Sequence, residues 1–193
     1  MYTFVKNSLV NNLIQEEFWI DTEEKRLKRI WRLSTNDNVV IGTLGKVTLA
    51  RLLEGVNLEI ANTAKISNLD FVLPILETGA LEDGDGYYII HPLHDGFLND
   101  AVDVFGNEAF ADQIVNMYAQ LKAAGYYKIQ WIKTNIIVDF TLQKLYIFGF
   151  LPLALIASDT NGAKKSLELA QADATFQTFD GDLVARIQAV INS

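Results

Sequence analysis

The amino-acid sequence predicts an α+β fold rather than regularly alternating βαβ units. Stretches with strand-like alternation lie before and after a helical pattern at residues 48–65, whose apolar positions recur at helical spacing. A second amphipathic helix is predicted at residues 108–124 and is followed by a small strand pair. Strands therefore cluster early and helices late, which is typical of the α+β class.

The N-terminal half is predicted to be rich in strands. Residues 3–20 alternate only loosely and receive no assignment, whereas 26–33 alternate well enough for a half-buried strand. Asn and Asp residues at 36–38 form a turn signal, because their side chains bond to the local backbone. The remaining predicted elements of this half are a strand at 39–41, the helix at 48–65, and strands at 70–78 and 87–90 joined by the acidic turn Glu82–Gly86.

The C-terminal half is predicted to be mostly helical. In the 108–124 helix, apolar residues fall on one face and Gly125 marks the end. We expect that face (Phe110, Ile114, Met117 and Leu121) to be buried near Trp131, Ile137 and Phe148. The other predicted elements are a short helix at 98–104, strands at 135–140 and 144–147, and helices at 163–172 and 181–191.

Composition excludes several classes of function. The chain has no cysteine and two histidines, which excludes disulfides, thiolate catalysis and histidine-rich zinc sites. A net charge of −8 argues against nucleic-acid binding, and the basic run Lys25–Arg29 is interpreted as a solvated strand entry. The longest apolar run, 145–157, is shorter than the roughly 20 residues that span a bilayer. With no secretory signal visible, we expect a cytoplasmic protein without membrane insertion.

The segments 125–139 and 144–150 carry the most specific pattern. Asn135 precedes an apolar strand, and a second apolar strand ends in Ile147-Phe148-Gly149. This pattern resembles the catalytic and metal-binding loops of protein kinases, which carry His-Arg-Asp, four residues and Asn, and later Asp-Phe-Gly. Lys128-Ile129-Gln130 stands in place of His-Arg-Asp, and Ile147 in place of the metal-binding Asp.

The resemblance covers about residues 26–150 and implies a reduced, two-lobe protein kinase-like fold. A small antiparallel-sheet N-lobe with one helix would occupy 1–91, and a short helical C-lobe 92–193. Gly42 would take the place of the catalytic lysine, and Glu54 or Glu59 that of its helix partner, although an ordinary surface or capping role is expected for either. The interlobe hinge would lie at His91, Pro92 and Leu93.

The resemblance implies that the phosphoryl-transfer chemistry is absent. Gly42 offers no charge to phosphates, Gln130 cannot act as a base, and Ile147 cannot coordinate a metal, which leaves Asn135 alone. The sequence thus predicts a non-enzymatic pseudokinase without cofactor or metal, serving as a scaffold or interaction module for a protein partner. In this loss of catalytic residues it is similar to the pseudokinase-like domains of type VII secretion proteins of the EssB/YukC family. The alternatives are an atypical minimal nucleotide-binding phosphotransferase and a structural subunit of a larger assembly, such as a secretion apparatus.

Overall fold

The computed structural model describes residues 1–11, 14–33, 49–97, 107–124, 136–149 and 181–192. The fold is a mixed α+β one with antiparallel sheets, as the sequence predicts. The chain divides into two compact units, which are described separately here. The first unit comprises residues 1–60 and 74–93, and the second comprises 61–73 and 94–193. The predicted assignment of 1–91 and 92–193 to kinase-like lobes stays a prediction.

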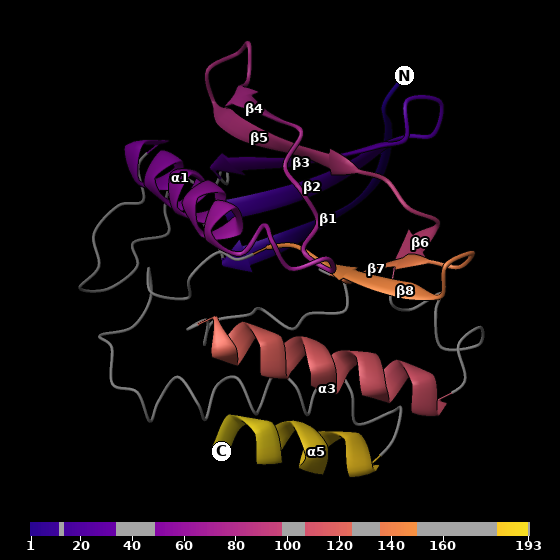
Figure 1. The fold of residues 1–193 in the computed structure, drawn as a ribbon. Coiled ribbons are helices and arrows are strands. Elements are labelled where there is room, and N and C mark those ends of the chain that lie inside the picture. The colour runs from indigo at the N-terminus through magenta and orange to yellow at the C-terminus, as the bar shows by residue number, and fades with distance from the viewer. Residues whose placement is uncertain (12–13, 34–48, 98–106, 125–135, 150–180, 193) are drawn as a thin grey trace. The chain divides into compact units, whose positions relative to one another are not determined.

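The first unit contains a five-stranded antiparallel sheet with the strand order β1-β2-β3-β5-β4 (Figure 1). The β2–β3 turn is held by the Asp21 carboxylate, whose Oδ1 accepts hydrogen bonds from the backbone N–H groups of Glu23 and Glu24. The loosely patterned region 3–20 thus forms two strands. The strands are β1 (Thr3–Asn11), β2 (Ile14–Asp21), β3 (Arg26–Leu33), β4 (Glu77–Ala80) and β5 (Gly86–Pro92).

One face of this sheet carries helix α1 (Leu49–Lys65). Strand alternation places Leu27 and Trp31 of β3 on that face, together with Phe18 of β2 and Ile89 of β5, and all four are buried. On α1, the buried positions 52, 56 and 59 recur at helical spacing and form one stripe. We call this the inner face of the sheet and the opposite one the outer face.

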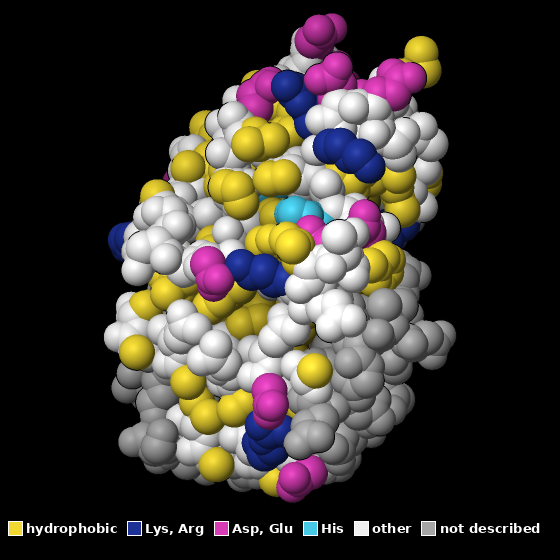
Figure 2. All heavy atoms as spheres, turned by 45° about the vertical axis from the view of Figure 1, so that its right-hand side comes forward, with side chains coloured by type: hydrophobic (Ala, Val, Ile, Leu, Met, Phe, Trp, Pro, Cys, Tyr) yellow, Lys and Arg dark blue, Asp and Glu magenta, His cyan; other side chains and the backbone are white. Residues whose placement is uncertain are grey.

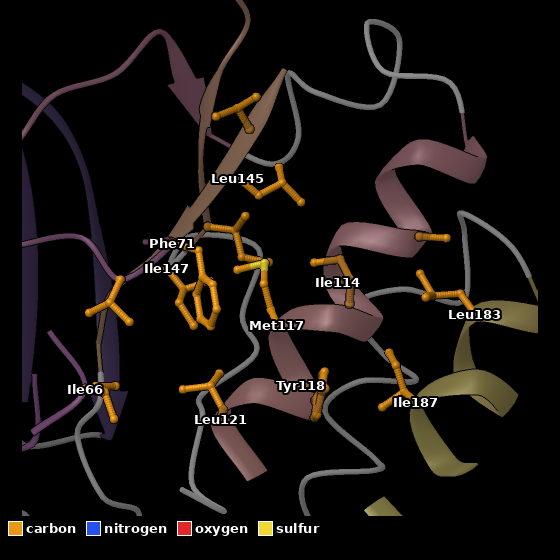
Figure 3. Packing of buried hydrophobic residues seen from close by; sticks show 14 residues of the cluster. Ile66, Phe71, Ile114, Met117, Tyr118, Leu121, Leu145, Ile147, Leu183 and Ile187 are labelled. Carbon is orange, nitrogen blue, oxygen red and sulfur yellow. The ribbon is translucent and has the colours of Figure 1, made fainter. Parts of the chain in front are cut away.

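Among its described residues, the second unit packs two helices and a three-stranded sheet around an apolar core (Figure 3). Three predicted core residues of the long helix, Ile114, Met117 and Leu121, are buried as expected, whereas the side chain of Phe110 and all of Trp131 lie outside the described residues. The elements are β6 (Gly96–Phe97), α3 (Asn107–Ala123), β7 (Ile136–Asp139), β8 (Lys144–Ile147) and α5 (Gly181–Asn192).

The segment 61–73 completes the core of the second unit, although it lies between two parts of the first unit in sequence. Phe71 O accepts a hydrogen bond from Ile147 N at 2.9 Å, and Leu73 N donates to Ile147 O at 2.9 Å. Ile66 joins Phe71 in the same buried cluster. This segment therefore adds a short parallel bridge beside β8.

The predicted strand at 70–78 is wrong over most of its length. Regular pairing begins only at Glu77, the first residue of β4. Pro74 lies in the middle of the predicted strand and has no N–H to donate to a ladder, so its apolar neighbours serve as a connection instead. The predicted elements at 39–41, 98–104 and 163–172 lie outside the described residues. Within the described ranges, no helix is long and apolar enough to cross a membrane.

Candidate functional site

The candidate site of the first unit is centred on a buried cation, Arg29, in the middle of β3. It lies between Leu27 and Trp31 in the strand alternation and so projects from the inner face, where its side chain is 1% exposed. The Trp31 ring centroid is 4.5 Å from the guanidinium carbon. The expectation that the run Lys25–Arg29 is solvated is therefore wrong for its last residue.

Two carboxylates bind the Arg29 guanidinium. Its Nε and Nη2 donate to Oε1 of Glu16 on β2, at 2.9 and 2.7 Å, and its Nη1 donates to Oε1 of Glu59 on α1. Glu16 is 4% exposed and Glu59 is fully buried. Burial alone would lower the pKa of Arg29, but the charges of Glu59 and Glu16 outweigh it and raise that pKa above its ordinary value. Arg29 therefore remains charged.

His91 of β5 completes the group. Its register partner is Leu27, which places the imidazole on the inner face, and it is fully buried. Nδ1 lies 2.9 Å from Pro74 O, and since a carbonyl oxygen can only accept, Nδ1 carries the hydrogen. Nε2 is 3.5 Å from Arg29 Nη1 and, in this tautomer, faces the guanidinium as an acceptor. We call Glu16, Arg29, Glu59 and His91 the buried charge cluster.

Sequence reasoning missed the buried charge cluster. Arg29 of β3 pairs with Glu59 of α1, a pairing that spacing along the sequence does not show. Glu59 is thus neither a surface nor a capping residue, whereas Glu54 is exposed. One signal could have revealed the buried cation: Arg29 lies between Leu27 and Trp31 at a position of β3 where the alternation calls for an apolar residue.

Of the four positions predicted to be the degenerate kinase positions, only Ile147 falls within the described residues. Gly42, Gln130 and Asn135 lie outside them, and their roles stay predictions. Ile147 ends β8 and is 1% exposed, with its backbone bonded to the 71–73 segment. The adjacent Phe148 is also 1% exposed.

The predicted hinge residues lie at the end of β5. His91 and Pro92 are its last two residues, and the His91 side chain belongs to the buried charge cluster. The N–H of Leu93 donates to Lys25 O at 2.8 Å, so this backbone group is engaged within the first unit. That these three residues form an interlobe hinge stays a prediction.

A second group of polar side chains lies on the three-stranded sheet of the second unit. His94 Nδ1 is 3.3 Å from Asp139 Oδ2, and the His94 ring stacks on Tyr146 with centroids 4.2 Å apart. Lys144 pairs with Asp70 at 2.8 Å, and its Nζ is 5.2 Å from the centroid of the same Tyr146 ring. The space-filling view shows histidine atoms at the surface beside hydrophobic and acidic side chains (Figure 2). Among the described residues, no group of three or more His, Asp or Glu side chains could hold a metal ion.

Comparisons with known proteins find a likeness among solved structures. No family model matches the sequence, and no curated protein matches it. Among solved structures, the chain is similar to the kinase PK-1 of Cydia pomonella granulovirus, with a TM-score of 0.42 and 12% sequence identity over 78% of this chain. The chain spans about half (51%) of the length of that kinase. The expectation that the chain is not an enzyme is thereby corrected, because the structure it is similar to is that of an enzyme.

Proposed function

We propose that this chain is a protein-interaction module or scaffold with a kinase-like fold. The observation that carries the proposal is the aromatic outer face of the five-stranded sheet. Strand register places Trp19 of β2 opposite both Phe4 of β1 and Lys28 of β3, and Tyr88 of β5 lies on the same side. Phe4 remains 46% exposed and the adjacent Val5 39% exposed.

The side chains of the outer face are held in fixed positions. The Phe4 and Trp19 rings meet edge to face with centroids 5.2 Å apart, and Lys28 Nζ lies 4.2 Å from the Tyr88 ring centroid. The Tyr88 hydroxyl donates to Glu77 at 2.7 Å. Aromatic residues are enriched at protein interfaces, and a prearranged side chain loses little conformational entropy on binding. The outer face therefore suits docking of a protein partner.

The buried charge cluster supports a rigid platform beneath that face. Glu16 and Glu59 hold the same guanidinium from β2 and α1, so Arg29 links three elements of the first unit. Charge-assisted hydrogen bonds of this kind are short and directional, which fixes the helix against the inner face.

The second candidate function is an atypical nucleotide-binding phosphotransferase. The Arg29–Glu59 pair favours it, because active kinases use the corresponding cation and glutamate to place the phosphates of ATP. Glu16 weighs against it, since a second carboxylate already takes two guanidinium donors that a phosphate would need.

A cross-linking pull-down from the native host tests the first candidate. Phe4→Ser with Val5→Ser removes exposed apolar area from β1, and Leu142→Ser removes a 66% exposed leucine from the second unit as a matched control. We expect a protein captured by the wild type to be retained by the Leu142 variant and lost by the β1 variant. Equal capture by all three would refute the outer-face assignment.

A thermal-shift titration with magnesium-ATP tests the second candidate. A ligand present at about 100 times its dissociation constant stabilises the folded state by about 2.7 kcal/mol. A rise in melting temperature that Glu59→Gln abolishes, together with release of phosphate, would favour the phosphotransferase. Capture of a partner that magnesium-ATP does not change would favour the interaction module.

A further inference from the structure

We propose that the outer face of the five-stranded sheet binds an extended acidic peptide segment of a partner protein, in which a carboxylate on Lys28 lies two residues from an apolar anchor. This partner chemistry rests on the proposed function and concerns the same face. A row of side chains that crosses the strands carries it. Phe4 of β1, Trp19 of β2 and Lys28 of β3 are register partners, so their side chains stand side by side on the outer face.

Lys28 is the cation of this row, and its ammonium group lies near two aromatic rings. Its Nζ is 4.2 Å from the Tyr88 ring centroid and 5.6 Å from that of Tyr2. In the part of the chain that the structure describes, Lys28 forms no ion pair, whereas Arg26 and Arg32 on the same face of β3 each lie beside a carboxylate. Lys28 is half-buried, so its ammonium group is partly removed from water without a counter-charge.

The glutamates of the outer face are bound to other groups. Glu17 of β2 accepts a hydrogen bond from Trp19 Nε1 at 2.9 Å. Glu77 of β4 accepts one from the Tyr88 hydroxyl at 2.7 Å. The ammonium group of Lys28 offers several N–H donors, which a carboxylate from a partner can therefore take up.

An apolar surface lies beside Lys28 in the same row. The Phe4 and Trp19 rings meet edge to face, and Phe4 is 46% exposed. Neighbouring strands lie about 4.8 Å apart, so the middle of the Phe4–Trp19 contact is about 7 Å from β3 at Lys28. In an extended peptide, side chains two positions apart point to the same side and are also about 7 Å apart. A peptide that crosses the strands can thus place an apolar side chain on the rings and a carboxylate on Lys28.

A peptide carboxylate suits this face better than a nucleic-acid backbone does. Nucleic-acid grooves carry several cations that follow successive phosphates. Among the described side chains of this face, both arginines of β3 already have carboxylate partners, and Glu17 and Glu77 add negative charge nearby. One available ammonium group beside a pair of rings fits one carboxylate beside one apolar side chain.

Selection from a random peptide library displayed on phage, with the full chain as bait, tests the proposal. We expect the recovered peptides to carry an acidic residue two positions from an aromatic or aliphatic one. A recovered peptide made synthetically should bind Lys28→Gln roughly tenfold more weakly than the wild type, because a hydrogen bond between charged groups is lost. Lys144→Gln is the matched control and should bind like the wild type. Lys144 Nζ also lies 5.2 Å from a tyrosine ring centroid, that of Tyr146, but it pairs with Asp70 at 2.8 Å.

A charge exchange distinguishes direct contact from loss of folding. Lys28→Glu should lose the acidic peptide and gain binding to the same peptide with lysine in place of its acidic residue, which the wild type should not bind. A misfolded variant could not gain binding. A library that yields no binder, binders without an acidic preference, or binding that Lys28→Gln leaves unchanged would overturn the inference.

The failure of this inference can be told apart from the failure of the proposed function. Peptides without an acidic preference that the β1 variant, Phe4→Ser with Val5→Ser, no longer binds would overturn the role of Lys28 and keep the outer face as a docking surface. Peptides that bind the wild type and the β1 variant equally would count against both. A single-stranded oligonucleotide that binds the wild type but not Lys28→Gln, with no acidic peptide recovered, would overturn the inference in favour of a nucleic-acid partner.

Discussion

Replacement of Arg29 by methionine tests how the first unit is held together. Methionine keeps an unbranched side chain and fits apolar surroundings, but it removes the guanidinium. Glu16 and Glu59, which are 4% and 0% exposed, then lose their shared guanidinium partner while staying in the interior. The variant therefore isolates the role of the charge from that of the volume.

The expected loss is large. Removing one partner of a buried ion pair costs about 3–5 kcal/mol, because the other charge stays buried without compensation. Arg29 has two such partners. Both carboxylates share one guanidinium, and the effects of neighbouring groups are not additive, so we expect a loss within this range rather than twice its size.

Urea denaturation followed by tryptophan fluorescence measures this loss, since the Trp31 ring lies 4.5 Å from the guanidinium carbon. A triple variant, Glu16→Leu, Arg29→Met and Glu59→Leu, is the control. Replacing a whole buried charge group by apolar side chains is often neutral or stabilising. We expect the triple variant to recover most of the stability that the single variant loses.

A loss below about 1 kcal/mol for Arg29→Met would refute the reasoning, because it would place the carboxylates in contact with water. A triple variant no more stable than the single one would also contradict it. In that case the cost would come from packing around β3 rather than from uncompensated charge.

Three further predictions follow from other contacts. Phe148→Ala should lower the free energy of unfolding by about 3–5 kcal/mol, measured in urea, because the side chain is 1% exposed. The pKa of Asp83 is held at about 2, mainly by its hydrogen bond from Arg32, and it should return to its ordinary range in Arg32→Gln, as read by carboxyl NMR. In the wild type, the ionised Asp83 carboxylate contributes stability above about pH 4, and this contribution is lost as pH falls toward 2. Gly86→Ala should lower the free energy of unfolding by about 1–3 kcal/mol in urea, because the added Cβ would overlap the backbone carbonyl oxygen of Trp31.

The sequence predicts the elements whose apolar residues recur with a strong period. It misses elements in which tertiary contacts place polar residues at buried positions. The helix expected at 108–124 is observed at Asn107–Ala123, and the strand expected at 144–147 is observed at Lys144–Ile147. Both have apolar residues on one face of a regular repeat. In contrast, β2 carries Glu16 on its buried face, so the apolar alternation that marks a strand is broken there.

The candidate site was less predictable than the fold for the same reason. A buried arginine and two buried glutamates are recognisable only when their pairing is known, and the three residues come from three separate elements. Residue spacing along one strand cannot show that Glu16 and Glu59 converge on Arg29. The kinase resemblance directed attention to Gly42, outside the described residues, rather than to β3.

The segment 61–73 limits how this protein can be cut into fragments. It follows most of the first unit's residues along the chain, yet its Ile66, Phe71 and Val72 belong to the core of the second unit. A fragment beginning at residue 94 would lack these three side chains and both backbone bonds to Ile147. Such a fragment would expose one side of its core and favour aggregation. During synthesis, residues 61–73 are also made well before α3, so these core residues lack that helix as a packing partner until it has been made.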